Sequence, residues 1–175
     1  MRHKHRMGEG VGHPHLYQIN VSDGGVPKHP VPDARVTQDG LVGDRQRNRR
    51  VHGGVDRAVC LFSLEVIQAL RAEGHTIAPG SSGENLTLTG VDWGRIQPGI
   101  VLQIGDSLRL EVTTYTAPCQ FNAQWFTTGD YSRISQKIHP GWSRVYARVL
   151  REGMVKRGDR FSVEPGTSQR GEEQG

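Results

Sequence analysis

Hydrophobic side chains alternate with polar ones in several short segments of the chain. Leu108, Leu110 and Val112 are separated by Arg109 and Glu111, which is the period-two pattern of a strand with one buried face. Stretches rich in glycine and proline separate these segments and mark turns. The pattern predicts strands over residues 15–21, 34–37, 57–62, 86–89, 145–150, 154–155 and 161–164, and a hairpin over 100–114.

One segment has helical spacing instead. Leu64, Ile67 and Leu70 recur at three-residue steps, a serine suited to N-capping precedes them, and Gly74 follows. These signals predict a helix over residues 63–73. Shorter helices are predicted over residues 120–126 and 130–138.

Many short strands and few helices favour a mainly β fold. Hydrophobic residues make up 34% of the chain, aromatic residues 6%, and 23 residues are glycine, which argues against a helical bundle. Closure of a sheet removes its exposed edges. We therefore predict a closed or nearly closed β-barrel with a few peripheral helices.

The 175 residues are enough for one domain with its own core. We expect a flexible basic arm over 1–14, a single domain over 15–164 and a disordered tail over 165–175. No apolar run approaches the roughly 20 residues that span a membrane, and we expect no signal peptide. Two cysteines form no disulfide framework, so we expect a cytoplasmic protein with no membrane partner.

The chain carries a net charge of +4, and most of its basic residues are arginine. One dense cluster consists of Arg45, Arg47, Arg49, Arg50 and Arg57. Arginine suits forked contacts with phosphate and carboxylate groups, which indicates an anionic partner. The alternative is a solvated basic loop. Nucleic acid is a weaker hypothesis, because the aromatic residues that stack on single strands are not interleaved with the arginines.

Cys119 is the first candidate for chemistry. It lies where the hairpin strand ends and a short helix is predicted to begin. A helix N-terminus stabilises a thiolate, the form that attacks electrophiles and binds soft metals. The alternative is a buried structural cysteine. Cys60 lies inside an apolar strand and is predicted to belong to the core.

Two glycine-containing turns carry further candidates. Gly43-Asp44-Arg45 and His52-Gly53-Gly54 place backbone N–H groups and a histidine where a phosphate can approach. Asn85, before a short strand, carries an amide donor and acceptor that suit a heterocycle. The alternative for each is a tight turn whose side chain bonds to the backbone.

Several runs then occur in a fixed order: Gly40-Leu41-Val42-Gly43-Asp44, His52-Gly53-Gly54-Val55-Asp56-Arg57-Ala58-Val59-Cys60, Gly83-Glu84-Asn85-Leu86, Ile104-Gly105-Asp106, Pro118-Cys119 and Gly141-Trp142. Over residues 15–164 this set resembles the MOSC domain family, the module at the C-terminus of molybdenum cofactor sulfurases. It is most similar to the stand-alone bacterial type, whose members help to detoxify N-hydroxylated bases.

The resemblance implies a β-barrel of the MOSC or PK type and a pocket for the molybdenum cofactor, an anionic pterin. It implies that Cys119 is a thiolate ligand of molybdenum. The pocket positions match Asp44, Arg45, His52, Gly53, Gly54 and Asn85, and Lys28 matches a lysine after the first strand. Many members have a basic residue shortly before the cysteine; Thr116-Ala117-Pro118 stands there in this chain, and Arg45 or Arg148 is expected to substitute.

The implied activity is reduction of N-hydroxylated or N-oxygenated substrates, with Lys28 or His52 supplying a proton. The chain has no flavin or iron–sulfur signature, so a separate electron-donor protein is expected. The alternative is a non-catalytic carrier in which Cys119 holds persulfide sulfur from a cysteine desulfurase or delivers the cofactor. Pyridoxal phosphate is not expected on this chain.

Overall fold

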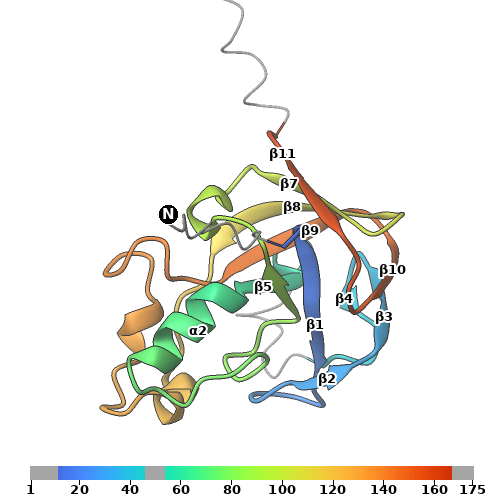
Figure 1. Cartoon of the computed structure of the whole chain (residues 1–175). Helices are drawn as coiled ribbons and strands as arrows, with labels where there is room; N and C mark the ends of the chain where they lie inside the picture. Colours follow the sequence, from blue (N-terminus) through green and yellow to red (C-terminus); the bar gives the residue numbers. More distant parts are fainter. Residues whose placement is uncertain (1–11, 46–53, 167–175) are drawn as a thin grey trace, which may run out of the picture.

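The computed structural model describes residues 12–45 and 54–166 (Figure 1). Its strands are β1 (His15–Val21), β2 (His29–Val31), β3 (Asp33–Thr37), β4 (Gly40–Leu41), β5 (Val59–Ser63), β6 (Leu86–Thr89), β7 (Val101–Ile104), β8 (Leu108–Tyr115), β9 (Val145–Arg151), β10 (Gly153–Lys156) and β11 (Phe161–Glu164). Its helices are α2 (Leu64–Ala72) and the 3₁₀ helices η1 (Val55–Arg57), η2 (Trp93–Arg95), η3 (Gln120–Trp125) and η4 (Tyr131–Ile134).

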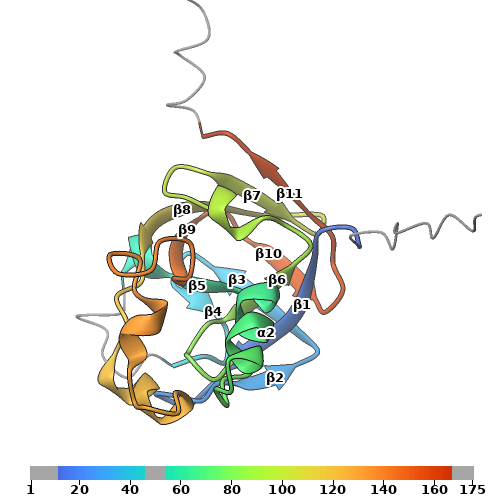
Figure 2. The ribbon, with the colours of Figure 1, turned by 60° about the vertical axis from the view of Figure 1, so that its left-hand side comes forward.

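The strands form two sheets. The larger has eight strands in the order β11-β7-β8-β9-β5-β6-β1-β2, and the smaller has the order β10-β3-β4. Neighbours in the large sheet are antiparallel except β5 and β6, which are parallel. A parallel pair needs a crossover connection, and α2 lies in the connection between these two strands (Figure 2).

Within residues 12–45 and 54–166, the sheets do not close into a ring. Backbone hydrogen bonds join Leu16 to Gly158 and Asp159, at 2.7 and 2.8 Å, so β1 comes close to the segment that leads into β11. Only an isolated bridge, His15 with Arg160, forms there, and β2 lies beyond β1 at the edge of the sheet. The mainly β prediction is confirmed, whereas closure into a barrel is not. β2 pairs with β1 at the edge of the large sheet, whereas β3, which follows it, pairs with β10 and β4 in the small sheet. The large sheet therefore ends at β2.

The core lies between the sheets and under α2. Ser63 caps this helix, since its Oγ accepts a hydrogen bond from the Val66 N–H at 3.2 Å. Val66, Ile67 and Leu70 are the buried residues of the helix, and they belong to the same hydrophobic cluster as the strand residues around them. The predicted helix and its cap are confirmed.

Other predictions differ from the structure in the loops. The glycine- and proline-rich stretches between the predicted strands contain two short strands that were not predicted, β2 and β4, while residues 46–53 lie outside the described part of the chain. The helix predicted over 130–138 is only the single turn η4. The expected arm over 1–14 and tail over 165–175 fall mostly on residues 1–11 and 167–175, outside the described residues. No helix within the described ranges is long and apolar enough to cross a membrane.

Candidate functional site

Three of the predicted site residues meet in one buried cluster. Asp44 lies three residues beyond β4, and its Oδ1 accepts hydrogen bonds from Lys28 Nζ at 2.6 Å and Ser22 N–H at 2.9 Å. Its Oδ2 accepts from the Asn85 amide at 2.9 Å. The side chains of Lys28 and Asp44 are 8% and 5% exposed. The ion pair is therefore buried. Together with Asn85 it joins three segments that are far apart in the sequence.

Asn85 uses both ends of its amide within the protein. Its Oδ1 accepts from the Cys60 N–H at 3.0 Å, while Nδ2 donates to Asp44. The backbone N–H of Asn85 also donates to the Cys60 carbonyl at 2.8 Å. These bonds fix the start of β6 against β5. The Asn85 side chain therefore connects β5 to Asp44, and both ends of its amide are bonded within the protein.

The loop before Asn85 packs tightly against Lys28. Gly80 has φ +85° and accepts a hydrogen bond from the Lys28 N–H at 2.9 Å. A Cβ at this glycine would overlap the Lys28 carbonyl oxygen, so a larger residue would push the loop away. Lys28 is thus held by its backbone as well as by its ammonium group.

Cys119 lies in the loop that follows β8. It is the N-cap residue of η3, and its carbonyl accepts from the Asn122 N–H at 2.9 Å. Its side chain is partly exposed, whereas Cys60 is buried. The predictions of a short helix after Cys119 and of a core position for Cys60 are confirmed. Of the two cysteines, Cys119 is the one that solvent and ligands can reach.

The residues just before β9 hold the Cys119 loop in place. Thr116 donates its N–H to the Arg144 carbonyl at 2.9 Å, and Ser143 Oγ donates to the Thr116 carbonyl at 3.2 Å. The Arg144 guanidinium donates to the Ala117 carbonyl at 3.4 Å and to the Ser82 carbonyl at 2.6 Å. Arg144 therefore connects the Cys119 loop to the loop before Asn85.

Tyr146 is a second residue that the sequence analysis did not single out. It is 7% exposed and stands opposite Cys60 in the pairing of β5 and β9. Burial raises its pKa to about 12, so it stays a neutral phenol at physiological pH. Arg57 lies over its ring at 5.5 Å from the centroid. Alternation along β9 predicted the strand but gave no signal that this aromatic residue borders the site.

The predicted arginines lie elsewhere. Arg45 is 70% exposed and 3.7 Å from Asp23. Arg148 is 44% exposed and forms ion pairs with Glu111 and Asp56 on the surface of the sheet. The ion pairs of Arg45 and Arg148 involve no residue of the Cys119 loop, whereas the Arg144 guanidinium donates to the Ala117 carbonyl. The sequence feature that could have pointed to Arg144 is its position directly before an apolar strand. A charged residue that is buried at such a place is usually held by polar partners.

The second predicted turn is only partly described. His52 and Gly53 lie outside the described residues. Gly54 has φ +97° and precedes η1, a backbone conformation that favours glycine. Among the residues that the structure describes, no group of three or more His, Cys, Asp or Glu side chains gathers to hold a metal ion.

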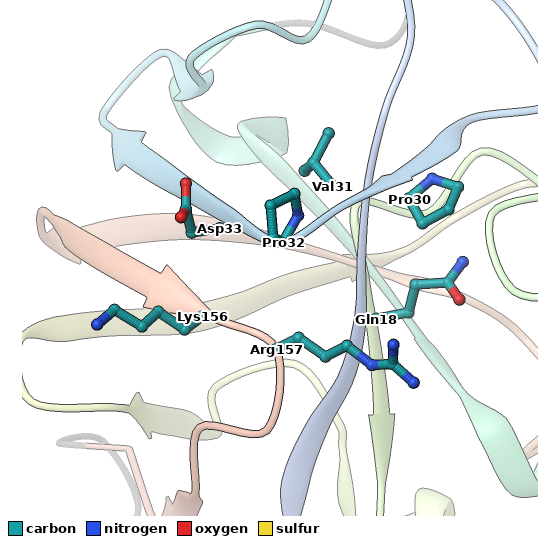
Figure 3. Close-up of a pocket in the computed structure, with 7 residues that line it drawn as sticks. All are labelled: Gln18, Pro30, Val31, Pro32, Asp33, Lys156 and Arg157. Carbon is teal, nitrogen blue, oxygen red and sulfur yellow. The ribbon is translucent and has the colours of Figure 1, made fainter.

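Two hollows in the described surface do not include the predicted site residues. A groove of about 590 Å³ between β2 and β10 is lined by Gln18, Pro30, Val31, Pro32, Asp33, Lys156 and Arg157 (Figure 3). A second hollow, of about 270 Å³, includes Trp93, Tyr115 and Ser143. Neither contains Cys119, Asp44 or Asn85, so the candidate site is defined by its side-chain chemistry.

Glu84 is a fully buried carboxyl group beside the site. It accepts hydrogen bonds from the Gly80 N–H, from Ser82 Oγ at 2.8 Å and from Thr87 Oγ1 at 3.1 Å. Burial raises its pKa above the ordinary value of 4.5, although these hydrogen bonds and the charge of Arg144 oppose the shift. Ionised Glu84 therefore weakens the fold relative to protonated Glu84.

This shift predicts how stability depends on pH. A carboxyl group with a raised pKa contributes stability below its unfolded pKa and loses that contribution as pH rises through the folded pKa. The stability of the wild type minus that of Glu84→Gln should therefore fall as the pH rises above the ordinary carboxyl pKa of 4.5. Urea unfolding at a series of pH values measures it. A difference that stays constant or rises with pH would contradict the assignment.

Comparison with known proteins identifies the family of the chain. The model of the MOSC domain matches residues 48–162, and the chain therefore belongs to the MOSC domain family. Protein YiiM of Escherichia coli (strain K12) is 28% identical over 112 residues, which cover 61% of this chain and 50% of YiiM. A protein named "Reductase" from Gibberella moniliformis (strain M3125 / FGSC 7600) is 29% identical over 129 residues, covering 71% of this chain and 22% of that protein.

Solved structures support the fold. The YUAD protein of Bacillus subtilis superposes with a TM-score of 0.70 at 16% identity, over 87% of this chain and 96% of that one. At this level of identity the likeness concerns the fold alone. The chain spans half or less of the length of YiiM and of the fungal reductase, so their full activities are not transferred to it by similarity.

Proposed function

We propose that this chain binds the molybdenum cofactor with Cys119 as the protein ligand of the metal and reduces N-hydroxylated or N-oxygenated substrates. The observation that carries the proposal is the position of Cys119: a partly exposed thiol in a loop fixed by hydrogen bonds from Ser143 and Arg144. Membership of the MOSC domain family and a relative named a reductase support it. The two free cysteines fit a reducing compartment, and we propose a cytoplasmic location.

The described residues fit a group of this kind. Thiolate is a soft ligand suited to a sulfur-rich metal centre. Two buried polar atoms near Cys119, Asn122 Oδ1 and Arg144 Nε, have no hydrogen-bond partner among the described residues. Buried polar atoms usually have partners, and we propose that a bound group or a water molecule pairs with these two.

The cofactor, when bound, would supply the two-electron redox chemistry. The overall reaction takes an N-hydroxylated compound, two electrons and two protons to the amine and water; the electrons come from a separate donor protein. Cys119 holds the metal, and the Lys28–Asp44–Asn85 cluster holds the loops around it. Lys28 is bound to Asp44, so we assign it to this structural role and keep His52 as the proton donor.

The test uses protein purified without oxygen from a host that makes the cofactor. Reduced methyl viologen is supplied as the electron donor and an N-hydroxylated cytosine as the substrate. We expect amine formation that depends on the protein and on the donor. A protein that holds molybdenum but forms no amine from any N-hydroxylated or N-oxygenated compound tried would contradict the reductase activity.

The alternative is a sulfur carrier, and the exposure of Cys119 against the burial of Cys60 also favours it. In that reaction a desulfurase persulfide passes its terminal sulfur to the Cys119 thiolate, and the desulfurase keeps a thiolate. Incubation with a cysteine desulfurase and cysteine, followed by mass spectrometry, would show a gain of one sulfur atom on the peptide that contains Cys119. A peptide that never gains sulfur would exclude the carrier role.

A further inference from the structure

The groove of about 590 Å³ between β2 and β10 has the size of a site for a small molecule (Figure 3). Pockets that bind small molecules and cofactors have volumes of about 300–1,000 Å³. The residues that line the groove do not include Cys119, Asp44 or Asn85. The groove is therefore a separate candidate for ligand binding.

The two walls of the groove are fixed relative to each other. The Arg157 N–H donates to the Pro32 carbonyl at 3.1 Å, and Lys156 stands opposite Asp33 in the pairing of β10 with β3. The Gln18 side chain is held as well, since its Nε2 donates hydrogen bonds to other atoms of the protein. A site that is formed before its ligand arrives avoids the cost of ordering loops on binding.

One wall is apolar and rigid. It consists of Pro30, Val31 and Pro32, which lie on one side of the groove in Figure 3. The two prolines are exposed and Val31 is partly exposed. A proline side chain has almost no freedom to lose when a ligand covers it. A flat ring of a ligand can therefore lie on this wall and bury apolar surface at little cost in entropy.

The opposite wall carries two positive charges. Lys156 and Arg157 are exposed, and neither takes part in an ion pair with another described residue. The Arg157 guanidinium lies over the Tyr17 ring, 5.8 Å from its centroid, and its N–H groups donate to no acceptor among the described residues. Asp33 is the only carboxylate in the lining, so two cations and one anion leave the groove with a net positive charge.

We propose that this groove is a binding site for a small organic anion that carries a flat apolar ring. The ring lies against the wall of Pro30, Val31 and Pro32. The carboxylate or phosphate group of the ligand binds the Arg157 guanidinium, whose forked N–H groups match both kinds of anion, and Lys156 adds its charge. The proposal goes beyond the proposed function, since neither Cys119 nor the molybdenum cofactor contributes to it.

The test titrates four compounds into ¹⁵N-labelled protein and follows the assigned backbone amide signals by nuclear magnetic resonance. Benzoate and phenyl phosphate combine a ring with an anionic group. Benzamide is the matched uncharged compound, and inorganic phosphate is the matched anion without a ring. Arg157→Gln removes the guanidinium. Arg95→Gln is the control variant, because Arg95 is also exposed but lines neither hollow.

We expect benzoate or phenyl phosphate to shift the amide signals of Val31, Asp33 and Arg157 in a saturable manner. The tighter of the two identifies the anionic group that the site prefers. Benzamide and inorganic phosphate should bind at least about tenfold more weakly than that compound. Arg157→Gln should raise its Kd by at least about tenfold, whereas Arg95→Gln should match the wild type.

Several results would overturn the proposal. Benzamide that binds as tightly as the tighter anion would mean that charge is not recognised, and inorganic phosphate that does so would mean that the apolar wall contributes nothing. An equal loss of affinity in Arg95→Gln and Arg157→Gln would indicate attraction by the net charge of the protein. The absence of saturable shifts with either ring compound at about 10 mM would show that the groove is not a site of this kind. None of these results depends on molybdenum in the protein.

Discussion

Replacement of Asp44 by alanine is expected to lower the free energy of unfolding by about 3–5 kcal/mol. The side chains of Lys28 and Asp44 are almost fully buried and lie 2.6 Å apart. Removal of the carboxylate leaves the Lys28 ammonium without its partner in a buried position. It also removes the acceptor of the Ser22 N–H and the shorter of the two hydrogen bonds that the Asn85 Nδ2 donates. Urea unfolding of the wild type and Asp44→Ala measures the difference.

Two controls make this result specific. Asp23→Ala removes a carboxylate from an ion pair with Arg45 that is exposed on both sides, and exposed pairs contribute little, so its stability should match the wild type. Lys28→Met in the Asp44→Ala background removes the unpaired charge and should recover part of the loss. A change below about 1 kcal/mol for Asp44→Ala would mean that the cluster does not hold these loops.

Replacement of Cys119 by serine is expected to lower reductase activity by more than about 100-fold. Serine keeps the size of the side chain but replaces a soft thiolate by a hard, weakly acidic hydroxyl. The carbonyl of residue 119 still accepts from Asn122, so the loop itself should be preserved. Amine formation from an N-hydroxylated cytosine, with reduced methyl viologen as donor, measures the effect.

Cys60→Ala is the matched control for this substitution. Cys60 is buried in β5, and burial raises the pKa of its thiol, so it stays protonated and out of reach of a metal. Loss of its sulfur costs some packing but leaves the site chemistry intact, and the variant should retain most of the activity. Full activity in Cys119→Ser would show that Cys119 is not the metal ligand. Loss of activity in Cys60→Ala alone would show the same.

The sequence predicted best what depends on local periodicity. The hairpin of β7 and β8 and the helix after Ser63 were readable because their hydrophobic positions repeat over many residues and their ends carry turn or capping residues. The strands β2 and β4 are two or three residues long, too short for a period to show. Closure of the sheet was predicted because it removes exposed edges. It is not confirmed, since β11 and β2 stand at the two ends of the large sheet.

The site was predicted in part. The runs that resemble the MOSC domain family brought Lys28, Asp44 and Asn85 into consideration, but only the fold shows that they bond to one another. The basic residue beside the Cys119 loop was sought among Arg45 and Arg148. The structure shows Arg144 beside this loop. Because β9 pairs with β8, the residue that precedes β9 lies next to the loop that follows β8. Arg144 and Ala117 are 27 positions apart in the sequence.

The most direct test of the central claim is the molybdenum content of the protein. Wild type and Cys119→Ala are expressed in a host that makes the cofactor, purified without oxygen, and analysed for metal per chain. We expect near-stoichiometric molybdenum in the wild type and a background level in Cys119→Ala, with both proteins folded. Equal molybdenum in the two proteins, or none in either, would contradict the role of Cys119 as its ligand.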